Sequence, residues 1–222
     1  GDFTNGNWLS GIDAIDSERL GNRAVITEGA KANKGWNRFY YLPLLLGLIG
    51  LVFHAIRDPR QFLVVAMLFV LTGLAIVVYL NQYPYQPRER DYAFVGSFYA
   101  FAIWIGLSVF ALFEASRRLD LKTLAQISGA TVGAGILLYV AESFSGGGHA
   151  LSLSVLFIGL VTSLLLALSW AMNQGGVSEL KRAQLLVLLT LTVPALMAND
   201  GWDDHSRARR RTGVDFAKNY MD

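Results

Sequence analysis

The chain has 222 residues, of which 53% are hydrophobic and 16% charged, with no cysteine and a formal net charge of +2. An average soluble domain has about 45–50% apolar and about 25% charged residues. The apolar content excludes a disordered chain and a nucleic-acid-binding chain. The lack of cysteine excludes disulfides, thiolate metal sites and thiol catalysis.

The charged residues are confined to part of the chain. Six stretches contain no Asp, Glu, Lys or Arg: Phe39–Ile56, Phe62–Leu80, Tyr92–Phe113, Thr123–Ala141, Ala150–Met172 and Ala183–Ala198. An apolar run of about 18 residues crosses about 30 Å of hydrocarbon. The runs are continuous rather than alternating, which excludes a transmembrane barrel. The sequence therefore predicts an all-α, polytopic membrane protein with six transmembrane helices within residues 39–198.

The short loops between these runs differ in charge. Arg57–Gln61, Glu114–Lys122 and Asn173–Arg182 contain seven Lys or Arg residues together, whereas Asn81–Asp91 and Glu142–His149 contain two. Short basic loops stay on the cytoplasmic side of a membrane. We therefore expect the first three loops inside and both termini outside the cytoplasm.

Residues 1–38 are then predicted to be an outer-face segment. Three apolar side chains recur at helical spacing: Trp8, Ile12 and Ile15. This spacing predicts a short helix lying on the membrane surface. Asp13 and Asp16 fall on it, as candidates for a general base or, more commonly for such residues, as solvated carboxylates. Because the chain opens at Gly1 without a signal peptide, we expect it to be a piece of a longer protein.

Residues 199–222 are predicted to open another domain on the outer side. Asp203, Asp204 and His205 could bind a divalent metal or a sugar hydroxyl, but consecutive side chains rarely reach one ion. We therefore predict no metal site. Trp202 is expected at the membrane interface, and the basic run that follows it on a solvated helix.

The predicted spans contain almost no ionisable side chains. His54 is the exception, three residues from the inner end of the first predicted span. Ion-coupled transporters usually place such groups in the middle of the membrane, so a lipid or solute transporter is disfavoured. Gly129 and Gly133 have the small-xxx-small spacing that predicts close helix packing.

The loop from Asn81 to Tyr92 is the strongest candidate site. Its two prolines exclude a regular helix, and in an extended segment Arg88 and Arg90 point to one side. Two guanidinium groups at a membrane surface suit a phosphate or pyrophosphate. In the alternative interpretation both arginines pair with Glu89 and Asp91, or with lipid phosphates, and only anchor the helix.

The same residues carry a family resemblance. The stretch Gly73–Tyr99, GLAIVVYLNQYPYQPRERDYAFVGSFY, resembles bacterial protein O-mannosyltransferase-like membrane proteins. The opening GDFTNGNWLSGIDAIDSERLG and the tail WDDHSRARRRTGVDFAKNYMD are similar to the same family. Its members resemble GT-C glycosyltransferases, which take a sugar from a polyprenyl-phosphate donor and act on the periplasmic side. The resemblance implies a place in the bacterial inner membrane with periplasmic termini, where residues 199–222 would start a periplasmic C-terminal domain.

The resemblance implies transfer of a mannose-like sugar to a protein or glycan acceptor. Arg88 and Arg90 would bind the donor phosphate, and Tyr85, Glu89, Asp91 and Tyr92 would support them. The catalytic carboxylate of GT-C enzymes lies in the first outer loop, which we expect upstream of Gly1. No cofactor is expected. The alternative from another class is a non-catalytic membrane scaffold that recruits a partner through its outer tail.

Overall fold

The computed structural model describes residues 9–20, 38–81, 91–146 and 148–205. Its elements are α1 (Asp13–Leu20), α3 (Leu42–Arg57), α4 (Pro59–Phe69), the π-helical turn η2 (Val70–Leu74), α5 (Ala75–Leu80), the 3-10 turn η3 (Asp91–Phe94), α6 (Val95–Arg118), α7 (Leu121–Ser145), α8 (Ala150–Gln174) and α9 (Glu179–His205). Apart from an isolated bridge between Leu9 and Arg38, these described segments form no β-structure. The all-α prediction is confirmed.

Five helices are long and apolar enough to cross a membrane: Pro59–Leu80, Tyr92–Arg118, Leu121–Ser145, Ala150–Gln174 and Glu179–Asn199. They correspond to the last five predicted spans, and they make the chain a multi-pass membrane protein by architecture. The first predicted span forms α3, which has 16 residues and is shorter than a usual crossing. A sixth crossing therefore stays a prediction.

Helix α9 passes through the predicted domain boundary after Ala198. It runs for 27 residues, with Pro194 inside it, and its last residue is His205. The predicted span Ala183–Ala198 is thus part of a continuous helix. Residues 199–205 extend that helix.

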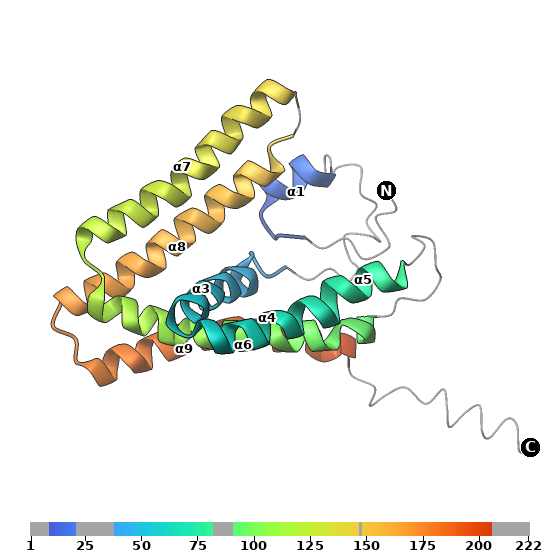
Figure 1. Ribbon diagram of the computed structural model, residues 1–222. Helices are drawn as coiled ribbons and strands as arrows, with labels where there is room; N and C mark the ends of the chain where they lie inside the picture. The colour runs from blue at the N-terminus through green and yellow to red at the C-terminus, as the bar shows by residue number, and fades with distance from the viewer. Residues whose placement is uncertain (1–8, 21–37, 82–90, 147, 206–222) are drawn as a thin grey trace, which may run out of the picture.

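Helix α6 is the centre of the packing, with α3, α4, α8 and α9 around it, whereas α7 packs along α8 as a hairpin (Figure 1). One stripe of α6 is buried: Ser97, Ala100, Trp104, Ser108, Leu112 and Ser116. The spacing of about four residues places these side chains on one helix face. Ser108 and Ser116 donate to the carbonyls of Ile105 and Phe113, both at 2.6 Å, so their burial leaves no hydroxyl unpaired.

Glycines set the closest helix approach. The space that a Cβ atom on Gly50 of α3 would fill is occupied by the backbone carbonyl of Trp104. Gly135 of α7 packs in a similar way against Leu156 of α8. Nothing lies within 4 Å of the Cβ positions of Gly129 and Gly133, so the predicted packing role of this pair is wrong within the described chain. The pair faces away from α8.

His54 has a packing role near the end of α3. Its Nδ1 accepts a hydrogen bond from Nε1 of Trp104 at 3.3 Å. The ring of Phe62 packs edge-on against His54, with centroids 5.8 Å apart. This lone histidine of the predicted spans is therefore held between α4 and α6 by a hydrogen bond and an aromatic contact.

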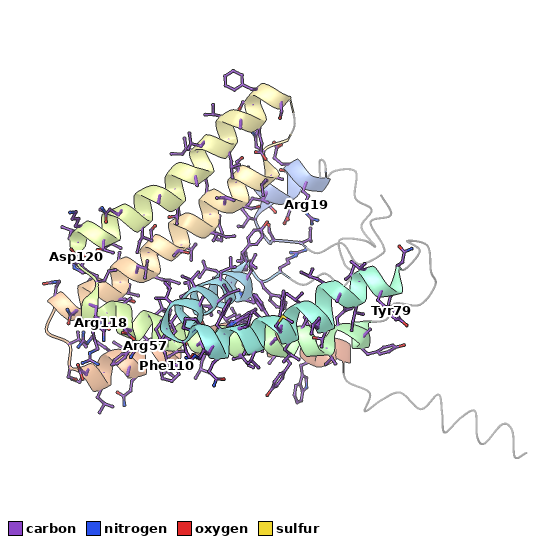
Figure 2. The ribbon with its side chains drawn as sticks, viewed as in Figure 1. Arg19, Arg57, Tyr79, Phe110, Arg118 and Asp120 are labelled. Atoms are coloured by element: carbon purple, nitrogen blue, oxygen red, sulfur yellow. The ribbon has the colours of Figure 1, made fainter. Side chains whose placement is uncertain are left out.

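The helices alternate in direction, which separates two ends of the bundle. Figure 2 shows Arg57, Arg118 and Asp120 towards one end and Arg19 and Tyr79 towards the other. The three basic loops of the sequence lie at the first end, and we call it the basic end. The opposite end contains α1 and the C-terminal end of α5, so we call it the α1 end. The side of the membrane that each end faces stays a prediction.

Candidate functional site

The loop from Asn81 to Tyr92, which contains Arg88 and Arg90, begins and ends at the α1 end of the bundle. Asn81 follows the last residue of α5 in a left-handed conformation with φ of 37°, and Asp91 begins η3. Arg88 and Arg90, with Tyr85 and Glu89, lie outside the described residues, as does the side chain of Asp91. Tyr92 is described and is 66% exposed. The structure therefore places the two ends of the loop and one of its tyrosines.

Asp16 of α1 is a buried structural carboxylate. It is 1% exposed and accepts hydrogen bonds from the backbone N–H and the hydroxyl of Ser10, at 2.8 and 2.9 Å, and from the N–H of Gly11 at 3.1 Å. The expectation of a solvated carboxylate is wrong for Asp16 because these donors replace water. Asp13, by contrast, is exposed at the start of the same helix.

The predicted interfacial helix is present in part. Helix α1 begins at Asp13, and Ile15 is 2% exposed, while Trp8 lies outside the described residues. The helix packs against α8 rather than standing alone. The apolar spacing therefore correctly predicted a helix, but the apolar side of this helix packs against protein.

A second carboxylate joins α1 to the α7–α8 hairpin. Glu18 accepts a hydrogen bond from the backbone N–H of His149 at 3.1 Å. Because His149 directly precedes α8, this carboxylate lies at a helix N-terminus, where negative charge is favourable. Glu18 therefore fixes α1 to the start of a long membrane helix.

Glu142, near the end of α7, completes a polar cluster at this junction. The hydroxyl of Ser152 donates to Glu142 Oε2 at 2.5 Å, and Nδ1 of His149 lies 3.7 Å from the same oxygen. The ring of Tyr139 stacks on His149 with centroids 4.2 Å apart. Glu18, Glu142, Ser152 and His149 form what we call the junction cluster.

The junction cluster has the residue types of a hydrolytic triad but a different arrangement. In a triad the serine hydroxyl donates to the imidazole, which acts as the base. Here Ser152 donates to the carboxylate of Glu142. No group of three or more metal-ligating side chains occurs in the part of the chain that the structure describes. The geometry therefore favours a structural role in joining α1, α7 and α8.

Sequence reasoning missed this cluster. Glu142 and His149 bound a glycine-rich turn, and Tyr139 and Ser152 each lie three residues further from the turn. This symmetric spacing could have predicted the cluster, because side chains three residues apart lie on the same face of a helix. Both ends of the turn are held by hydrogen bonds or stacking.

The outer-tail candidates lie in the last turn of α9. Asp203, Asp204 and His205 belong to this helix, and their side chains lie outside the described set. Trp202 precedes them and is 76% exposed. The structure thus places their backbone on one helical turn and does not test metal binding.

At the basic end, Arg182 is buried although the sequence placed it in a loop. It is 6% exposed, and its Nη1 donates to the carbonyl of Ser116 at 3.1 Å and to Oδ1 of Asn173 at 2.6 Å. These partners belong to α6 and α8. One side chain of α9 therefore links three helices.

Two aspartates at this end begin helices. Asp58 accepts from the N–H groups of Arg60 and Gln61, at 3.2 and 3.1 Å, and Asp120 accepts from the N–H of Thr123 at 3.1 Å. Hydrogen bonds from the side chain and the backbone of Thr123 hold the pKa of Asp120 below its ordinary value. Both residues are N-caps that define the turns of the basic end.

Comparison with known proteins adds no family to this geometry. No family model matches the chain, and no curated protein or solved structure matches it either.

Proposed function

We propose that this chain is the membrane part of a glycosyltransferase. In this proposal it moves a mannose-like sugar from a polyprenyl-phosphate donor to a protein or glycan acceptor on the periplasmic side of a bacterial inner membrane. The observation that carries the proposal is the Arg88–Arg90 pair in a proline-containing loop between two membrane helices. The resemblance of Gly73–Tyr99 to protein O-mannosyltransferase-like proteins supports it.

The described helices agree with this role for the loop. A donor with a polyprenyl tail lies in the bilayer, and its phosphate lies at the headgroup level. A loop that connects two membrane helices at one end of the bundle would meet that phosphate. Negative charge grows on the departing phosphate during transfer, so two fixed guanidinium groups there would stabilise the transition state.

The test is glycan transfer by the full-length protein with a polyprenyl-phosphate mannose donor. Arg88→Ala and Arg90→Ala should each lower the rate by about a hundredfold, as expected when a donor to a developing anion is lost. Arg57→Ala and Arg60→Ala are matched controls, because they remove the same charge at the basic end. Normal transfer by both loop variants, at normal membrane insertion, would refute the role of the pair.

The second candidate is a non-catalytic scaffold that recruits a partner. It is favoured by Trp202, a large side chain that is 76% exposed on the last turn of α9. A scaffold would tolerate both loop substitutions and would lose its partner on deletion of Trp202–Asp222. The glycosyltransferase proposal predicts instead that the two loop substitutions impair function.

A further inference from the structure

The basic end contains a cationic surface that the proposed function does not use. The end of α6 and the start of α9 lie side by side there, and Arg182 of α9 is bonded to Ser116 of α6 and to Asn173 of α8. Arg117 lies on this surface with its Nε 3.2 Å from Oε1 of Glu179, and Nη2 of Arg182 lies 3.9 Å from the same oxygen. One carboxylate is thus shared by two guanidinium groups, so the site has an excess of positive charge.

The cationic side chains at the basic end outnumber the anionic side chains there. The Nε atom of Arg182 is buried and has no hydrogen-bond partner within the described chain. Lys122 at the start of α7 and Lys181 at the start of α9 are exposed, and Arg118 is 72% exposed beside its ion-pair partner Glu114. Across its three loops the basic end has seven Lys or Arg residues and four Asp or Glu residues. A bound anion would balance this excess.

We propose that the surface formed by Arg117 and Lys181, beside the buried Arg182, binds the phosphate of an anionic phospholipid. Guanidinium groups bind phosphate through paired hydrogen bonds, and basic pockets between membrane helices bind acidic headgroups. The surface lies at the ends of α6 and α9, both long enough to cross a membrane, where headgroups meet protein. Phe110, two turns back on α6, is 63% exposed, which offers an apolar path for an acyl chain.

The existing ion pair does not compete strongly with such a ligand. The side chains of Arg117 and Glu179 are 54% and 61% exposed. Exposed pairs of this kind contribute about 0–1 kcal/mol. A phosphate can therefore displace Glu179 from Arg117 at little cost, while Arg182 keeps its bonds to Ser116 and Asn173.

The proposal is tested by native mass spectrometry of the full chain taken from nanodiscs of phosphatidylglycerol and phosphatidylcholine. We expect the wild type to retain phosphatidylglycerol in preference to phosphatidylcholine. Arg117→Gln with Lys181→Gln should lower that retention by about fivefold for each charge removed, since a basic residue near the headgroups contributes about 1 kcal/mol. Arg182 stays intact in this variant because its loss would loosen the helix packing.

Arg57→Gln with Arg60→Gln is the control, because it removes two cations from the same end but from another turn. The control should retain the lipid. Equal retention of both lipids by the wild type, or equal loss in both double variants, would overturn the proposal. A thermal stabilisation by inorganic phosphate as large as that by phosphatidylglycerol would also overturn it in favour of a site for free phosphate.

Discussion

The backbone carbonyl of Trp104 occupies the space where a side chain on Gly50 would begin. This contact brings α3 and α6 together. A methyl group at position 50 meets backbone rather than a movable side chain, so the helices themselves must separate. The pairing of the 16-residue helix α3 with the central helix therefore depends on the absence of a side chain at one position.

Gly50→Ala is expected to destabilise the chain by about 3 kcal/mol, because overpacking that shifts backbone reaches that size. Thermal unfolding in detergent measures the change. Gly106→Ala is the matched control on α6, since nothing lies within 4 Å of its Cβ position. The control should be neutral or gain up to about 1 kcal/mol from helix propensity. Equal stability of the two variants would contradict the packing described.

Arg182→Met is expected to lower stability by about 2 kcal/mol, because it removes hydrogen bonds from a buried charged group and leaves the Ser116 carbonyl unpaired. Lys181→Met changes an exposed neighbour and should stay within about 0.5 kcal/mol of the wild type. Both are measured by thermal unfolding in a detergent without anionic lipid. A harmless Arg182→Met would show that α6, α8 and α9 are held by apolar packing alone.

Asp16→Ala should release the turn before α1, because the N–H groups of Ser10 and Gly11 lose their acceptor. We expect faster hydrogen exchange in residues 10–20 and unchanged exchange in α6. Ser17→Ala, which removes an exposed hydroxyl on the same helix, is the control and should leave exchange as it is. Unchanged protection in the Asp16 variant would mean that packing on α8 suffices to hold α1.

Thr123→Val should raise the pKa of Asp120 towards its ordinary value, because the Thr123 hydroxyl is the main cause of the lowered pKa. Carbon-13 NMR titration of the carboxyl group measures this. Because the pKa is lowered by folding, the cap stabilises α7 above the pKa of the unfolded chain. That stabilisation is lost as the pH falls through the lower pKa of the folded chain. An identical titration in the variant would contradict the Thr123 hydrogen bond.

The long helices could be predicted because their cause is a bulk property. Charge-free length reports the thickness of hydrocarbon that a segment can cross, and five such segments became helices of suitable length. The ends of the helices were predicted less accurately. Asp58 and Asp120 begin α4 and α7 as N-caps, and capping extends the helices beyond the charge-free runs.

Contacts between distant segments could not be predicted in the same way. Arg182 counted as a loop cation, but its partners at Ser116 and Asn173 become neighbours only when three helices meet. Asp16 was expected in solvent because its donors come from a turn whose shape the apolar spacing does not encode. Gly129 and Gly133 matched a packing pattern, yet which face of α7 meets α8 is decided by Gly135.

The central claim is that the Arg88–Arg90 loop lies on the outer membrane surface, opposite the basic end. Because these 222 residues contain no cysteine, Arg88→Cys and Arg60→Cys each introduce the single thiol of this stretch, and any cysteine elsewhere in the expressed protein is replaced by serine. The decisive measurement is labelling of intact spheroplasts with a membrane-impermeant maleimide. The account predicts that position 88 is labelled and that position 60 is labelled only after lysis. Protection of position 88 until lysis, with position 60 labelled in intact spheroplasts, would contradict it.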